Sequence, residues 1–371
     1  MKNNFYNKTE IIFIIIFSLF IILTNNYFNL ENINPSAKSS IYYFDISNSW
    51  PNEANFKNDI QSLIHAERFI IPYFLGFISN LININIFYLY KITSYTFLIL
   101  FIIINYNIFY VLLNNNSKII FFSLMLFNPY IFRYFLANPL MLNDLIFFIS
   151  VSLLALSLFK KKNYYFYIAI FLAIISRQSS YIIILALIIT FFFPLKEKFI
   201  DYKKILVALL ILFIKIVITN YYTTRSDLTE FYDIAITGLF IFLTDKFDFI
   251  ELIKFISYPL LSYFPVIILS LFCFYRKLIK LKIDEKSILL LILILGFFAQ
   301  PLLAGPLISG KNIIRLCSFG YFIMIYLLCY NLKSTNFNNK IYNFVIILIL
   351  IIWSLHPTFS NVEIFENLKF D

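Results

Sequence analysis

Charged residues are scarce in this chain of 371 residues. Asp, Glu, Lys and Arg make up 13% of it, whereas about a quarter of a soluble globular domain is charged. Hydrophobic residues make up 61%, and run after run approaches the ~20 apolar residues that cross a bilayer. This composition excludes a soluble protein and predicts an integral membrane protein with several spans.

Cysteine is also scarce, and its distribution argues against two kinds of site. The three cysteines, Cys273, Cys317 and Cys329, all lie in apolar runs and show no metal-ligand spacing. The cysteines therefore predict neither a disulfide framework nor a cysteine-bound metal. We also expect no bound cofactor and, with one clear loop carboxylate, no tight metal site. Participation of a divalent cation stays open.

The apolar runs are continuous in Ile, Leu and Phe rather than alternating, which favours helices over a barrel. We expect an all-α polytopic membrane protein, with residues 1–371 forming a single transmembrane domain. The sequence predicts about eleven transmembrane helices, at residues 11–28, 86–113, 119–136, 139–159, 163–176, 179–194, 204–219, 252–275, 287–304, 313–331 and 341–357.

Basic residues set the predicted orientation. A formal net charge of +10 could indicate nucleic-acid binding, but more than half of the 30 basic residues fall in short loops on one predicted side. The positive-inside rule makes that side cytoplasmic, so we expect no nucleic-acid partner. The N-terminus, with Lys2 and Lys8, is predicted in the cytoplasm and the C-terminus outside. No small-x-small cleavage site follows the first run, so we expect an uncleaved span.

Residues 30–68 form the longest polar interval, and their acids outnumber their bases, as expected outside the membrane. The next apolar stretch, 69–82, is short and contains Pro72. Counting it as a span would place Lys160–Lys162 outside, against the positive-inside rule. We therefore predict an interfacial helix there, and an extracytoplasmic loop over 30–85. A second extracytoplasmic loop is predicted at 220–250.

Several ionisable residues lie near the predicted outer face. At membrane depth such groups cost about 2.5–3.5 kcal/mol or more, so each needs a partner or a function. Structural alternatives stay open: Arg68 as an interface anchor, Asp144 paired with Arg133, and the cations of the tenth span as snorkelling anchors. The converging residues are Arg68, Asp144, Arg177, Lys311 and Arg315.

Cations at a lipid–water boundary suit a lipid-linked phosphate, because Arg offers a planar fork of donors and Lys a point charge. A carboxylate in the facing loop suits a general base that takes a proton from an acceptor hydroxyl. The predicted arrangement therefore favours a lipid-dependent glycosyl transfer outside the membrane.

In order and placement, these features resemble the integral-membrane glycosyltransferases of the GT-C fold, which use polyprenyl-phosphate sugars (mannosyltransferases and arabinosyltransferases among them). That family has a first span, an outer loop with an acid and interfacial helices, and then many spans. The resemblance covers about the first 195 residues. The segments that carry it are Ile41–Asp45, Arg68–Tyr73, Phe127–Tyr130 with Arg133, Asn143–Asp144 and Ser176–Ser179.

The resemblance implies that Asp45 is the catalytic base and that Asp144 supports the loop. It implies that Arg177 and Arg315 bind the donor phosphate, with Arg68 and Lys311 as further substrate-binding cations. It also implies a bacterial cytoplasmic (inner) membrane location, a polyprenyl-phosphate sugar donor, a glycan, lipid or protein acceptor, and contact with membrane lipids.

Two departures from the family pattern keep alternatives open. Asp45 is flanked by Phe44 and Ile46 rather than by a second acid, so the base could be another residue of the same loop. The two short runs 163–176 and 179–194 predict a helical hairpin, and Gln178 stands at its tip, where an acid is common in the family. The secondary candidates are Glu53, Asp59 and His65.

Two other functions remain as alternatives. A polysaccharide polymerase or O-antigen-ligase-like enzyme has a similar number of spans, but its large outer loop usually lies later in the chain. A lipid-linked glycan flippase or transporter usually shows internal repeats and polar residues at the membrane midplane, and neither is visible in this sequence.

Overall fold

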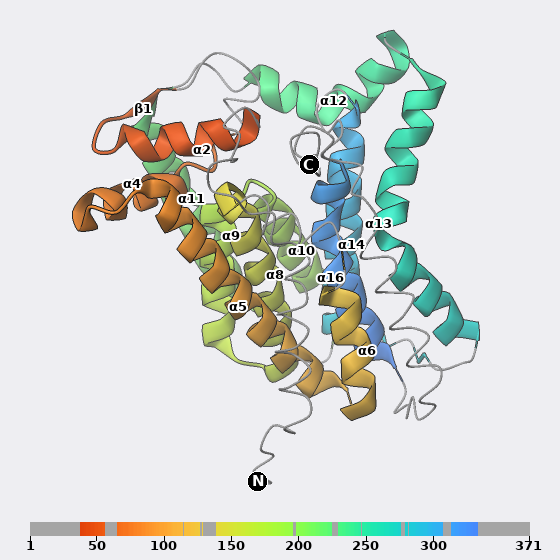
Figure 1. Ribbon diagram of the computed structural model, residues 1–371. Helices are drawn as coiled ribbons and strands as arrows, with labels where there is room; N and C mark the ends of the chain where they lie inside the picture. The colour runs from red at the N-terminus through yellow and green to blue at the C-terminus, as the bar shows by residue number, and fades with distance from the viewer. Residues whose placement is uncertain are drawn as a thin grey trace, which may run out of the picture.

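The computed structural model describes most of the chain between residues 38 and 332, which is almost wholly helical (Figure 1). The all-α class is thereby confirmed for this part of the chain. The described residues are 38–55, 65–113, 115–126, 128, 139–195, 198–224, 229–245, 247–275, 279–280, 282–306 and 313–332.

Four stretches are long and apolar enough to cross a membrane: α5 (Ile86–Leu112), the short 3₁₀ helix η2 with α8 (Pro139–Lys160), α11 (Tyr202–Tyr222) and α14 (Glu285–Leu303). This is what an integral membrane protein requires. The total of about eleven spans stays a prediction, because the expected spans 11–28 and 341–357 lie outside the described residues.

Most of the remaining helices coincide with the apolar segments expected from the sequence. α9 and α10 form the helical hairpin predicted over 163–194. These helices are α2 (Lys38–Ser49), α4 (Ile70–Ile82), α6 (Asn115–Leu126), α9 (Asn163–Ser176), α10 (Ser180–Phe192), α12 (Thr229–Asp245), α13 (Phe249–Tyr275) and α16 (Ile313–Asn331).

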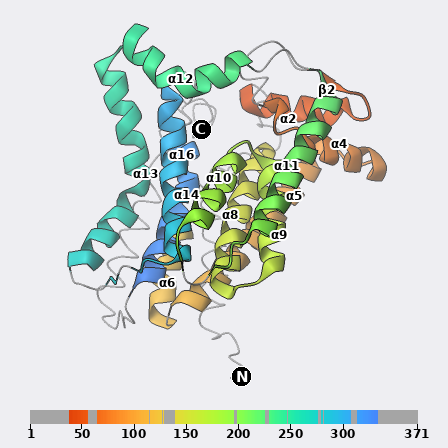
Figure 2. The ribbon, with the colours of Figure 1, turned by 180° about the vertical axis from the view of Figure 1, so that it is seen from behind.

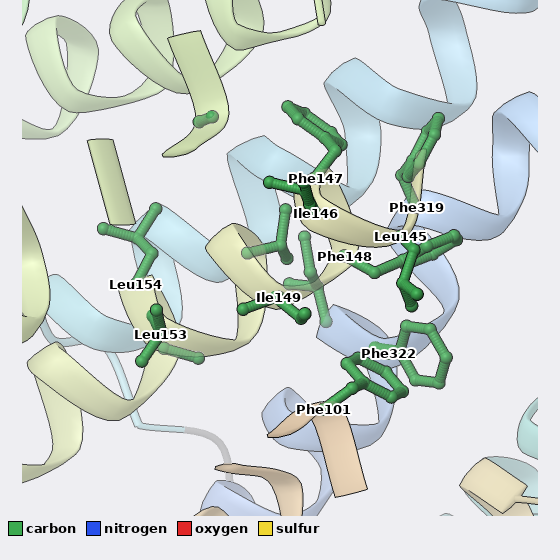
Figure 3. Packing of buried hydrophobic residues seen from close by; sticks show 14 of the residues in the cluster. Phe101, Leu145, Ile146, Phe147, Phe148, Ile149, Leu153, Leu154, Phe319 and Phe322 are labelled. Carbon is green, nitrogen blue, oxygen red and sulfur yellow. The ribbon is translucent and has the colours of Figure 1, made fainter. Parts of the chain in front are cut away.

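The helix α8 (Leu142–Lys160) is the centre of the bundle. In its apolar stretch 94% of the residues are buried, against 17% in that of α11. A helix that is hydrophobic all round belongs in a core. Phe147 and Phe148 of α8 lie among Phe319 and Phe322 of α16 and Phe101 of α5, with ring centroids 4.7–6.3 Å apart (Figure 3). Aromatic contacts therefore hold three helices together.

The short helices α2 and α4 lie at one end of the bundle (Figure 1). α4 has 13 residues, which at 1.5 Å per residue gives a length of about 20 Å, too little to cross the ~30 Å hydrocarbon core. It ends at Asn83, whose left-handed backbone (φ 53°) directs its N–H to the Ser79 carbonyl. A helix that stops short of a span agrees with the sequence analysis of residues 69–82.

The two segments expected as extracytoplasmic loops meet at that same end. β1 (Ala54–Asn55) pairs in parallel with β2 (Thr223–Thr224), and Figure 2 shows β2 beside α2. β1 belongs to the loop 30–85 and β2 to the loop 220–250. Their contact agrees with both loops lying on one side of a membrane.

Two spans begin at aspartate caps. Asp201 accepts the Lys204 N–H at the start of α11, and Asp284 accepts the Ser287 N–H at the start of α14. Burial alone would raise the pKa of the Asp201 carboxyl, but the hydrogen bond from the Lys204 N–H and the Lys204 ammonium hold it below its usual value. Glu285 accepts the N–H groups of Phe199 and Ile200, which joins the two helix starts.

α2 and α4 cross at Gly76. A Cβ at this position would overlap the backbone carbonyl of Ser47, so only glycine permits this crossing. The Ser47 hydroxyl also donates to the Pro72 carbonyl at 2.8 Å. The position of α2 over the bundle end therefore depends on close backbone contact with α4.

We expect Gly76→Ala to destabilise the protein by about 1–3 kcal/mol, as overpacking of a close contact does. The matched control is Gly296→Ala on α14. There the added Cβ would meet Ile182 Cγ2 at 2.5 Å, which is a side-chain methyl rather than a backbone carbonyl. Thermal unfolding in detergent should give a lower Tm for Gly76→Ala than for Gly296→Ala, and equal Tm values would contradict the assigned crossing.

Candidate functional site

Buried polar side chains gather where α2 and α4 cover the end of the bundle. We call this group the polar cluster. It draws on α2, on the segment before α4, on the start of α8, on the α9–α10 turn, and on α11 and α14. Its members are Tyr43, His65, Glu67, Arg68, Asn143, Asp144, Arg177, Gln178, Ser179, Lys215 and Gln300.

An ion pair between Asp144 and Arg177 joins α8 to the hairpin tip. The two side chains are 0% and 1% exposed. Asp144 lies in the first turn of α8, where the helix dipole favours a carboxylate. The Arg177 guanidinium also lies 4.7 Å from the centroid of the Phe319 ring, in reach of a cation–π contact. The hairpin tip is thus fixed on the central helix.

A second buried ion pair joins Glu67 to Lys215 of α11. Glu67 is one of the acids of residues 30–68, and Lys215 is not among the residues that the sequence predicts at the site. The signal that could have found the pair is the position of Lys215 inside an apolar run, since a cation at membrane depth needs a partner. This pair fixes the segment before α4 against α11.

Arg68 is buried, 6% exposed, and contacts neutral groups. Its Nε donates to Gln178 Oε1 at 2.9 Å and its Nη1 to the Tyr43 hydroxyl at 3.1 Å. The Asn143 side-chain amide donates to the Arg68 carbonyl at 2.9 Å. No carboxylate of the described residues lies within ion-pair distance of Arg68.

Counted over the residues that the structure describes, the polar cluster has an excess of positive charge at Arg68, because each of the two ion pairs is neutral. A guanidinium has five N–H donors in a fixed fork, and two of its nitrogens are held by Gln178 and Tyr43. In a low-dielectric setting a cation of this kind attracts an anion strongly. A phosphate or carboxylate fits this requirement.

Asp45 lies on the exposed face of α2. Tyr43, Ile46 and Ser47 are buried, and two residues along a helix correspond to a turn of about 200°. The carboxylate therefore lies on the side of α2 away from the Tyr43–Arg68 hydrogen bond. Its assignment as catalytic base stays a prediction.

The other candidates are distributed unevenly. Glu53 is exposed between α2 and β1. His65 is buried and stacks on Tyr42, with ring centroids 4.8 Å apart, while its edge meets Tyr43 at 4.9 Å. Asp59, Lys311 and the side chain of Arg315 lie outside the described residues, as does Arg133, the alternative partner of Asp144.

No group of three or more His, Cys, Asp or Glu side chains that could hold a metal ion occurs in the part of the chain that the structure describes. The three cysteines are buried and form no disulfide. The described members of the polar cluster supply guanidinium, ammonium, carboxylate, amide, imidazole and hydroxyl groups.

No protein-family model matches this chain, and neither a curated protein nor a solved structure is found to be similar to it. Its function is therefore argued from the polar cluster and the fold. The likeness to the GT-C glycosyltransferases rests on the sequence features given above.

We expect Asp144→Leu alone to lower the free energy of unfolding by about 3–5 kcal/mol, because it leaves the Arg177 charge buried without its carboxylate. Adding Arg177→Met should restore most of the loss. The readouts are the monodisperse fraction and the Tm in detergent. The control is Asp201→Ser, which keeps a capping oxygen and removes only a partly exposed pair worth about 0–1 kcal/mol. A single variant as stable as the double variant would contradict the role of this pair.

Proposed function

We propose that this protein is a glycosyltransferase of the bacterial cytoplasmic membrane. It transfers a sugar from a polyprenyl-phosphate donor to a glycan, lipid or protein acceptor on the extracytoplasmic face. The single observation that carries the proposal is the buried charge of Arg68 at the end of the bundle that α2 and α4 cover, which no carboxylate of the described residues pairs with.

The donor phosphate explains this charge. A polyprenyl chain lies in the bilayer and its phosphate at the interface, which is the level that the polar cluster occupies if α4 lies in the interface. Charge-assisted hydrogen bonds from a guanidinium to phosphate are short and strong. They also stabilise the negative charge that builds on the phosphate as it leaves the sugar.

The Asp144–Arg177 pair determines which of the cations is available to bind the donor phosphate. The resemblance assigns phosphate binding to Arg177 and Arg315, but Asp144 balances the Arg177 charge. Arg177 then acts as a positioning residue. It fixes the turn whose next residue, Gln178, accepts the hydrogen bond from Arg68. Arg68 becomes the main phosphate ligand in the described part of the site.

Asp45 supplies the base in this proposal. Its carboxylate takes the proton of the acceptor hydroxyl, whose oxygen forms the new bond to the anomeric carbon while the bond from that carbon to the phosphate oxygen breaks. The exposed position of Asp45 leaves it accessible to an acceptor. Asp45 and the Arg68–Tyr43 contact lie on different sides of α2. Both groups must reach one reacting centre, so the proposal requires a donor that extends around α2 from Tyr43 to Asp45.

The experiment is donor turnover in proteoliposomes. Radiolabelled polyprenyl monophosphate sugars are supplied with a cell-envelope extract, and label is followed from the lipid to the acceptor fraction. Asp45→Asn should lower transfer at least about 100-fold, the usual worth of a general base, with normal insertion and yield.

The matched control is Glu53→Gln, which removes a second exposed carboxylate from the same loop and should retain transfer. Full activity of Asp45→Asn would overturn the assignment of the base. Wild-type turnover of polyprenyl diphosphate repeat units alone would replace the proposed function by that of a polymerase or ligase.

A further inference from the structure

A cavity of about 360 Å³ lies between α2, α4 and the start of α5, beside the Gly76 crossing. Its volume falls within the ~300–1,000 Å³ of small-molecule sites. It is distinct from the polar cluster: its lining shares no residue with the two buried ion pairs or with Arg68.

All ten described residues that line this cavity are uncharged, and half of them carry an amide or a hydroxyl. Asn48, Asn80 and Asn85 are exposed at its rim. The Asn80 amide nitrogen donates to the Gly76 carbonyl and the Asn85 oxygen accepts the Phe87 N–H. An asparagine side chain has both donors and acceptors, and each of these two hydrogen bonds uses only part of them. The amides can therefore both donate to and accept from a ligand.

Aromatic rings complete the lining. Trp50 is half-buried and is held by contacts with Tyr73 and Phe77, with ring centroids 4.9 and 5.1 Å apart. Phe44 stacks on Phe87 at 4.5 Å. The rings offer flat apolar surface next to three amides. No described lining residue is charged, which disfavours phosphates, carboxylates and amines.

We infer that this cavity binds one uncharged sugar residue. A hexose ring has an apolar C–H surface for the aromatic rings and hydroxyl groups that both donate to and accept from the asparagine amides. The charged end of a phospholipid lacks a partner here, and an acyl chain would leave the amides unsatisfied.

Phe44, Ser47 and Asn48 of α2 line the cavity, and the same helix carries Asp45, the proposed base. A sugar bound in the cavity therefore lies against this helix. Its role as the acceptor subsite rests on the proposed function. Binding of the sugar itself does not, because it follows from the lining residues alone.

The chain contains two tryptophans, Trp50 and Trp353, which permits a direct test. In a Trp353→Phe protein, the fluorescence reports on Trp50. The full chain is reconstituted in lipid nanodiscs without sugar-headed detergent. It is titrated with methyl glucopyranoside, methyl mannopyranoside, methyl galactopyranoside and N-acetylglucosamine, with glucuronate and glycerophosphocholine as charged comparison ligands.

We expect a saturable fluorescence change with at least one uncharged sugar and none with the charged ligands. Asn80→Leu should raise the Kd about tenfold, because it removes one or two hydrogen bonds to the sugar. The matched control is Asn107→Leu on α5, since Asn107 donates to the carbonyl four residues earlier, at 3.0 Å, as Asn80 does, and lies outside the cavity lining. Asn48→Leu on α2 repeats the test if Asn80→Leu fails to fold.

Three results would overturn the inference: no saturable change with any uncharged sugar, an unchanged Kd in both lining variants, or an equal response to glycerophosphocholine. Sugar binding without donor turnover would contradict the proposed function and support the sugar site. Donor turnover without any sugar-induced fluorescence change would support the proposed function and contradict the sugar site.

Discussion

The ion pair between Asp144 and Arg177 is the interaction on which the rest of the site depends. It is fully buried, and such a pair is costly to break, because either partner alone is an uncompensated charge in a low-dielectric medium. The pair fixes the α9–α10 turn on α8, and the next residue of that turn, Gln178, holds Arg68. Arg177, which is paired with Asp144, thus positions Arg68, which is not paired with a described carboxylate.

The same constraint explains why α2 lies where it does. Arg68 donates to Tyr43 of α2, and the glycine at position 76 lets α2 approach α4 closely enough for Ser47 to reach the Pro72 carbonyl. The loop that the sequence singles out as polar is therefore attached to the membrane-embedded bundle by arginine on one side and by backbone contact on the other. The sugar cavity is formed by that second contact.

Much of this arrangement could be predicted from local pattern. Apolar runs flanked by lysines predict the helices, and two short runs around Arg177 predict the hairpin, because each depends on neighbouring residues. The partners of the buried charges could not be predicted this way. Lys215 and Glu67 are far apart in the chain, and the cavity draws on three helices, so only tertiary packing brings them together. The face of α2 that Asp45 occupies also depends on packing, since residues 38–49 carry no clear amphipathic pattern.

The central claim is that Arg68 binds the phosphate of a polyprenyl donor. Photocrosslinking with a diazirine-bearing polyprenyl monophosphate, followed by peptide mass spectrometry, tests it directly. The account predicts labelled peptides that contain residues 65–69 or 177–179, with labelling competed by unlabelled polyprenyl monophosphate and strongly reduced in Arg68→Gln. Labelling confined to peptides at the opposite end, around Asp201 and Asp284, or labelling that is unchanged in Arg68→Gln, would contradict it.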